Sequence, residues 1–253
     1  MSVTKLHFLS AGRCGVAASM LDTRREAQPL VSLPIWSYLI DTTDGPILID
    51  TGMPDECVNH PDLFEAEGEE TTIAPYMSED DSIVRVLARV GYRPSDIVCL
   101  ISTHSHFDHA GGNRHFKGPE VFMQQAEYDE VIPRIGEAHA FDFWSTGDLQ
   151  YHLVSGDHEV APGILLLSTP GHSVGHQSVL VQTPRSGNIL LTIDAAYQAA
   201  NFEDEVPFAV ADPVLARSSI LKLRDVAASE KAFVFYGHDT VQEQAVNLYP
   251  AAY

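Results

Sequence analysis

Residues 97–109 read IVCLISTHSHFDH, an apolar run followed by three histidines and one aspartate within six residues. Imidazole nitrogens and carboxylate oxygens are good ligands for divalent transition metals, and especially for zinc. Gathering four such groups costs hydration and creates repulsion, and a bound cation offsets both. The cluster is internal and follows a strand pattern, which is not typical of a tag or a loose histidine-rich tail. The segment therefore predicts a metal site.

The spacing within this cluster divides the ligands into two sets. If the strand over residues 97–101 continues toward position 106, His104 and His106 lie on one face and reach one metal. Asp108 and His109 are adjacent, so they cannot face one way on a strand, but they converge at a turn or a helix start. This indicates a second, neighbouring metal, with the turn supplied by residues 110–113, which read AGGN.

Composition limits the partners of the chain. Of its 253 residues, 45% are hydrophobic, which is enough for a sizeable core. Lys and Arg total 15 against 35 Asp and Glu, so the formal net charge is -20. This charge opposes binding to a phosphate backbone, and we expect no nucleic-acid partner. Most of the carboxylates should be solvated, as in residues 65–70 and 78–81.

The first 20 residues lack a continuous apolar stretch, and nowhere do about 18 apolar residues run together. We therefore expect a soluble, cytoplasmic protein without membrane association. Its three cysteines, Cys14, Cys57 and Cys99, are far apart and include no CxxC pair. A disulfide framework or a thiolate zinc site is not expected.

No repeat or long linker interrupts the chain, so we expect one domain over residues 1–253. Two halves that each mix strands with helices predict layered sheets enclosed by helices. Residues 42–45 read TTDG and predict a hairpin turn. Strand patterns cover residues 4–9, 35–41, 46–50, 164–168, 177–182, 188–193 and 233–236. Helical spacing covers residues 82–90, ended by Gly91, and residues 212–228, with Val214, Leu215, Ile220, Leu221 and Leu223 available for burial.

Three further candidate ligands each end a strand pattern. His172 closes the sequence TPGH, in which Gly171 lets backbone approach closely, and it supplies a third histidine for the first metal. Asp194 follows the run LLTI, a costly place for a carboxylate unless it lies between two cations. His238 again follows a glycine at a strand end.

The other histidines lack this context. His176 also follows a glycine, but it opens the strand pattern at residues 177–182, and we assign it a structural or supporting role. Six more are expected outside the site: His7, His60, His115, His139, His152 and His158.

Together, His-x-His-x-Asp-His, Thr-Pro-Gly-His, the aspartate after an apolar strand and the late Gly-His resemble the motifs of the metallo-β-lactamase superfamily, whose fold is an αββα sandwich. The chain further resembles the N-acyl homoserine lactone lactonases, which quench bacterial quorum signals. The likeness covers nearly the whole chain and is weakest at residues 15–28 and 130–148. It is carried by residues 11–14, 45–54, 106–113, 190–197 and 201–208.

The resemblance implies a hydrolase with two zinc ions, although the same ligands accept other divalent metals. Its substrates would be N-acyl homoserine lactones, opened to N-acyl homoserines by a hydroxide that the two metals share. The implied ligands are His104, His106 and His172 for one metal, Asp108, His109 and His238 for the other, and Asp194 as the bridge.

The resemblance also implies roles beyond metal binding. The hydroxyl of Tyr197 would donate to the substrate carbonyl or to the developing oxyanion, and Asp108 would protonate the leaving alkoxide. Met20, Phe64 and Phe107 are candidates for the groove that holds the acyl chain. The expected partner is this small-molecule lactone, and the sequence leaves a monomer and a homodimer equally open.

Two other functions compete with this interpretation. A thioester hydrolase resembling glyoxalase II uses a similar ligand set. However, the chain has no obvious basic cluster for a glutathione group, and its C-terminal half is short for the helical domain that those enzymes carry. A non-catalytic metal-binding or interaction module is disfavoured by Asp194 and Tyr197 at an open site, because a structural zinc is closed by four ligands.

Overall fold

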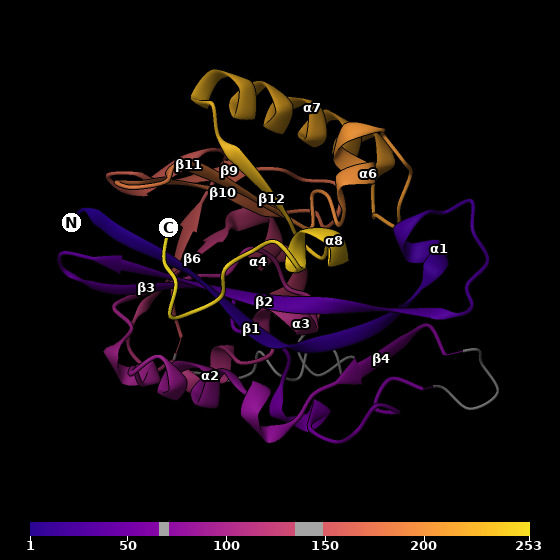
Figure 1. The fold of residues 1–253 in the computed structure, drawn as a ribbon, viewed down its shortest axis with the longest axis horizontal. Helices are drawn as coiled ribbons and strands as arrows, with labels where there is room; N and C mark the ends of the chain where they lie inside the picture. The colour runs from indigo at the N-terminus through magenta and orange to yellow at the C-terminus, as the bar shows by residue number, and fades with distance from the viewer. Residues whose placement is uncertain (66–70, 135–148) are drawn as a thin grey trace.

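Two β-sheets packed face to face, with helices on both outer faces, make up the computed structural model (Figure 1). Helices α6 (Ala199–Glu203) and α7 (Pro213–Glu230) cover the smaller sheet, and α2 (Ile83–Arg89) lies beneath the larger one. These four layers confirm the predicted αββα sandwich. The structure describes residues 1–65, 71–134 and 149–253.

In the described part of the chain, the larger sheet has seven strands in the order β4-β1-β2-β3-β5-β6-β7. Strands β1 and β2 pair antiparallel, and β2 turns into β3 at the predicted hairpin. Strands β3, β5, β6 and β7 run parallel, so their carboxyl ends meet at one edge. The bounds are β1 Val3–Ala17, β2 Leu30–Thr42, β3 Gly45–Ile49, β4 Ile73–Tyr76, β5 Cys99–Ile101, β6 Glu120–Gln124 and β7 Gln150–Val154.

The smaller sheet has five strands within the described residues, in the order β12-β11-β10-β9-β8. Strands β9 and β11 are both antiparallel to β10, and β12 is parallel to β11. The carboxyl ends of β9, β11 and β12 therefore lie at one edge, and each of the three precedes a candidate ligand. The bounds are β8 His158–Ala161, β9 Ile164–Ser168, β10 Gln177–Thr183, β11 Gly187–Ile193 and β12 Phe233–Tyr236.

Alternate strand residues face different layers. Ile40 and Leu191 belong to the core between the two sheets. Their neighbours Leu39 and Leu190 point the other way, toward α2 and α7 respectively. Because side chains alternate along a strand, each sheet is apolar on both faces and must be covered on both.

Helix α7 confirms the predicted helix but not all of its predicted burial. Val214, Leu215 and Leu221 are 76%, 44% and 38% exposed, so their expected burial was wrong. The buried stripe instead repeats at the helical spacing i, i+3, i+4, i+7, and these three residues lie off it. It consists of Ala216, Ser219, Ile220 and Leu223.

The predicted continuation of the strand before the histidine cluster was also wrong. Strand β5 ends at Ile101, because the next backbone groups bond elsewhere. The N–H of Ser102 still donates to Phe122 in β6, but the N–H of Thr103 donates to the carboxylate of Asp50 at 2.9 Å, and the carbonyl of Thr103 accepts from Gln177 in the smaller sheet. Residues 102–106 thus form a loop that joins the two sheets at the edge where the strands end.

The remaining helices are short, and two of them matter for the site. Helix α3 spans Phe107–Ala110 and α4 spans Gln125–Val131. Helices α1 (Ala18–Leu21) and α8 (Thr240–Glu243) have four residues each. Among the described residues, none of the helices combines the length and apolarity needed to cross a membrane.

The three cysteines are free, and all of them are buried. Two predictions fall outside the described residues: His139, expected away from the site, and residues 66–70 of the expected acidic surface.

Candidate metal centre

The structure brings all seven predicted ligands together at the edge where strands of both sheets end. His104, His106, His172 and Asp194 form a first ligand group, and Asp108, His109 and His238 form a second. Within each group the ligand atoms lie within 4.8 Å of one another, and the described residues contain no third such group. The loop after β5 and helix α3 supply four of the seven, and the loops after β9, β11 and β12 supply the others.

The first ligand group is centred on His172. Its Nε2 atom lies 2.8 Å from Nδ1 of His106 and 3.2 Å from Nε2 of His104. Oδ2 of Asp194 lies 3.1 Å from the same Nε2 atom. Three ring nitrogens and one carboxylate oxygen thus converge on one point, as ligands of one cation would.

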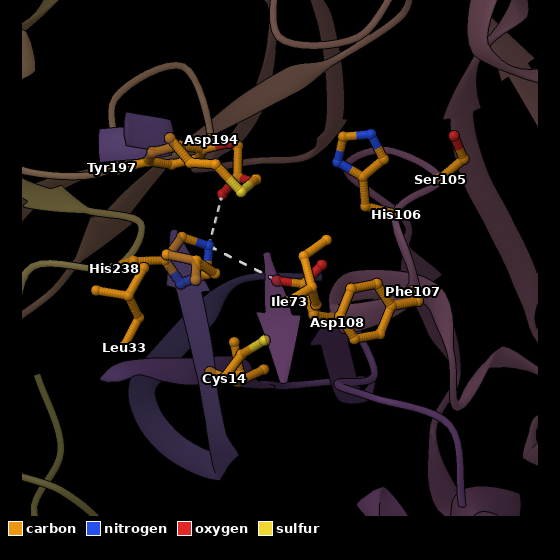
Figure 2. Close-up of a pocket in the computed structure, with 13 residues that line it drawn as sticks. Cys14, Leu33, Ile73, Ser105, His106, Phe107, Asp108, Asp194, Tyr197 and His238 are labelled. Atoms are coloured by element: carbon orange, nitrogen blue, oxygen red, sulfur yellow. Dashed lines mark ion pairs between the residues drawn. The ribbon is translucent and has the colours of Figure 1, made fainter. Parts of the chain in front are cut away.

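Asp194 faces both groups. While Oδ2 faces His172, Oδ1 lies 3.0 Å from Nε2 of His238 and 3.3 Å from Nε2 of His109. Figure 2 shows His238 between the carboxylates of Asp194 and Asp108. Oδ2 of Asp108 lies 3.8 Å from Nε2 of His238. One carboxylate that offers an oxygen to each group has the arrangement of a bridging ligand.

The polar atoms of the centre fit a pair of cations. Nε2 of His109 and Oδ1 of Asp194 are buried and have no hydrogen-bond partner among the described residues. Buried polar atoms normally have partners, and those without one call for an explanation such as an ion. The donor set of imidazoles and carboxylates suits zinc and other divalent transition metals.

Electrostatics point the same way. Burial would raise the pKa of Asp194, but His109, His238 and His172 outweigh it and hold that pKa well below its ordinary value. Burial would lower the pKa of His109, but the carboxylates of Asp194 and Asp108 hold it well above its ordinary value. Burial and three neighbouring imidazoles hold the pKa of His104 well below the usual range. The carboxylates therefore attract positive charge into the centre, and cations would supply it.

Hydrogen bonds orient the ligand rings of the second group. Oδ2 of Asp50, which is fully buried, lies 2.8 Å from Nδ1 of His109. The carbonyl of Pro34 lies 2.8 Å from Nδ1 of His238. Both partners can only accept, so each Nδ1 atom donates and leaves the Nε2 lone pair free for a metal.

His176 has the supporting role predicted for it. It is buried, it is in neither ligand group, and its Nε2 atom accepts from the backbone N–H of Asp194 at 3.1 Å.

Gly171, which directly precedes His172, has φ 132°, and a Cβ atom there would lie 2.2 Å from the backbone nitrogen of Ala216. Gly171 therefore allows the loop that carries His172 to pack closely against α7.

A cavity of about 300 Å³ opens onto both ligand groups. Met20 and Phe107, two of the predicted acyl-groove residues, line it, whereas Phe64 packs behind Phe107 with ring centroids 4.5 Å apart. Five further lining residues are apolar strand residues that carry no chemical signal in the sequence. These are Cys14, Val16, Leu33, Ile35 and Ile73.

Tyr197 also lines the cavity. Its hydroxyl lies 3.3 Å from Nδ1 of His172, and its ring packs against Phe208 with centroids 5.1 Å apart. Burial, together with Asp194 and Asp108, holds the pKa of Tyr197 well above its ordinary value, so the phenol keeps its proton.

Asp50 is a supporting residue that the sequence analysis missed. It follows the apolar strand β3 just as Asp194 follows β11, so the signal that identified Asp194 could also have found it. Glu127 on α4, which accepts from the backbone N–H groups of Ser105 and Gly175 in the loops of the first ligand group, was missed as well, because it does not follow a strand pattern.

Comparison with known proteins shows which proteins the chain is similar to. The family model of the metallo-beta-lactamase superfamily matches residues 31–238. The N-acyl homoserine lactonase AiiA of Bacillus thuringiensis subsp. kurstaki is 47% identical over 250 residues, which is 99% of each chain.

Solved structures agree. An N-acyl homoserine lactone hydrolase with the product N-hexanoyl-L-homoserine bound at its catalytic metal centre is 46% identical, with a TM-score of 0.94 over 100% of both chains. A variant of B. thuringiensis AiiA with N-decanoyl-L-homoserine at the active site is 45% identical, again with a TM-score of 0.94 over both full chains.

Proposed function

The chain belongs to the metallo-beta-lactamase superfamily and, within it, to the N-acyl homoserine lactonases, and on this premise we propose that it opens the lactone ring of N-acyl homoserine lactones with the help of two zinc ions. The reaction consumes one water. The carbonyl carbon gains an oxygen, the ring C–O bond breaks, and the ring oxygen leaves as a hydroxyl of the N-acyl homoserine product.

One observation carries the proposal: both ligand groups open onto a cavity whose wall is mostly apolar. None of the described residues that line it is Lys or Arg. A neutral lactone with an acyl tail suits such a wall, whereas the anionic glutathione of a thioester substrate would find no cationic partner there. The hexanoyl and decanoyl products held by the related enzymes have tails of this kind.

The two groups would each hold one metal, with Asp194 between them. Bound there, two divalent cations would supply an activated water and Lewis acidity toward the lactone carbonyl. The protein's part is to fix the ligands through Asp50, His176 and the carbonyl of Pro34, and to keep the surrounding wall dry.

Two side chains that reach the cavity would act on the substrate directly. The hydroxyl of Tyr197 faces the first ligand group and would donate to the carbonyl oxygen as negative charge develops on it. The half-buried carboxyl of Asp108 lines the cavity beside the second group and would take the proton that the attacking water releases and pass it to the leaving ring oxygen.

A pH-drop assay tests the proposal, because ring opening releases a carboxylic acid. Zinc-loaded protein is expected to hydrolyse N-hexanoyl and N-decanoyl homoserine lactones and to leave a glutathione thioester untouched, and chelator-treated protein to be inactive. Absence of lactone turnover in the zinc-loaded protein would defeat the proposal, and thioester turnover would favour the glyoxalase II-like alternative. Metal analysis of protein produced without added zinc identifies the native metal.

A further inference from the structure

Glu127 is a buried carboxylate outside both ligand groups. It lies on α4, its side chain is 1% exposed, and it accepts four hydrogen bonds. Oε1 accepts from the backbone N–H of Ser105 at 2.8 Å and from the hydroxyl of the same residue. Oε2 accepts from the hydroxyl of Ser173 at 2.7 Å and from the N–H of Gly175 at 2.9 Å.

These four donors belong to the two loops that carry the histidines of the first ligand group. Ser105 lies between His104 and His106 in the loop after the larger sheet's β5. Ser173 and Gly175 lie just after His172, between β9 and β10 of the smaller sheet. One carboxylate thus joins the two sheets at the point where Nδ1 of His106 and Nε2 of His172 come within 2.8 Å.

The close packing of α4 supports this arrangement independently. A Cβ atom on residue 175 would lie 2.3 Å from the backbone nitrogen of Glu127, so only Gly175 lets the loop approach the helix this closely. At the start of the same helix, Gln124 donates to Gln177 at 3.0 Å, and Gln177 in turn donates to the carbonyl of Ser102 at 3.0 Å.

We propose that Glu127 is a positioning residue that sets the metal affinity of the first ligand group by holding the His104–His106 loop and the His172 loop on one carboxylate. The second ligand group does not depend on it, because its rings are held by Asp50 and the carbonyl of Pro34. This inference rests on the proposed two-metal function and deepens it.

The chemistry of the site requires a carboxylate rather than an amide. Each oxygen of Glu127 faces one backbone N–H, that of Ser105 or that of Gly175. In a Glu127→Gln variant the amide NH₂ group must face one of these donors in either orientation, so one buried N–H loses its partner. The variant keeps size and shape while it releases one of the two loops.

The test measures zinc affinity stepwise by chelator competition in wild type, Glu127→Gln and Glu130→Gln. The last is a matched control, because Glu130 is exposed on the same helix. Loss of a group that orients metal ligands typically weakens metal binding by about 10- to 100-fold. We expect this loss for one of the two zinc ions in Glu127→Gln and wild-type affinity for both in the control. The visible spectrum of the cobalt-substituted variant should change for the same site only.

Wild-type affinity for both ions in Glu127→Gln, or an equal loss for both, would overturn the positioning role while leaving the lactonase function intact. Wild-type protein that binds fewer than two zinc ions would overturn the metal centre itself, and with it the proposal. The melting temperature of the metal-free proteins separates positioning from general stability. If Glu127→Gln does not fold, Ser173→Ala carries the same test, since it removes one donor and leaves the carboxylate; unchanged affinity there contradicts the proposal.

Discussion

The two ligand groups lie side by side and share Asp194, yet they are supported differently. In the first group, two rings contact the hydroxyls of Thr103 and Tyr197, but the carboxylate support acts on the backbone. Glu127 accepts from the N–H groups of Ser105 and Gly175 in the loops that carry the histidines. In the second group, the support acts on the rings: the acceptors sit directly on Nδ1 of His109 and His238.

This difference indicates how each group can fail. Ring hydrogen bonds fix the tautomer as well as the position of a histidine, so the second group depends on acceptors that keep the proton on Nδ1. The first group depends on the separation of two loops from different sheets. Substitutions in the two regions should therefore weaken different metals, and the following predictions test that separation.

The largest effect is expected where the groups meet. In Asp194→Asn one oxygen remains for one group and an NH₂ group faces the other, so the bridge is lost. Because each metal contributes several kcal/mol and 1.36 kcal/mol is tenfold in rate, we expect kcat/KM on a lactone to fall on the order of 10³-fold or more. The exposed Asp225→Asn is the matched control. Retention of two metals and of activity would contradict the bridging role.

The next largest effect should separate catalysis from metal binding. Tyr197→Phe removes the hydroxyl near His172 and keeps the ring that packs on Phe208. We expect a loss of about 2–3 kcal/mol in transition-state stabilisation, measured as kcat/KM, with both metals retained. An unchanged kcat/KM would remove Tyr197 from the mechanism, and the exposed Tyr249→Phe serves as the control.

Asp50→Asn should reverse the pattern expected for Glu127→Gln. Oδ1 accepts from the backbone N–H of Thr103, so the amide NH₂ of Asn would face Nδ1 of His109 and favour the wrong tautomer. We expect about 10- to 100-fold weaker binding of the metal in the second group, measured by chelator competition. A smaller loss in the first group is expected through Thr103, whose hydroxyl contacts both Asp50 and His104. Selective loss of the first metal would invert the comparison and refute it.

The smallest effect is expected for a substitution that lies near the first ligand group but does not touch the residues that hold its loops. Val214 lies at the start of α7, near His172 in the fold, and is 76% exposed. Val214→Ser should change the free energy of unfolding by no more than about 0.5 kcal/mol and leave both metal affinities unchanged. A change in metal binding would mean that the first group responds to any nearby substitution. The loss expected in Glu127→Gln would then not identify Glu127 as a positioning residue.

The sequence predicted the ligand groups better than their supports. His104 to His109, His172, Asp194 and His238 were identifiable because metal ligands follow strand ends in a recognisable pattern. The reason given for pairing His104 with His106 was wrong, since β5 ends at Ile101 and a loop brings them together. Asp50 shared the signal of Asp194 and was overlooked.

Other features could not be predicted because they depend on tertiary packing. Strands β4, β6, β7 and β8 are short and were not predicted, and Ile73 in the first of them forms part of the cavity wall. The contacts of Glu127 form only because α4 packs against loops from both sheets, and the sequence does not show this packing. Helix α7 has more apolar residues than its buried stripe contains, so the sequence alone did not show which of them are buried.

The two-metal mechanism is tested most directly by a zinc titration of metal-free protein, with the hydrolysis rate of an N-acyl homoserine lactone as the readout. We expect negligible turnover without metal and a rate that rises until two zinc ions are bound per chain. A rate that survives complete removal of metal, or that reaches its maximum at one zinc ion per chain, would contradict it.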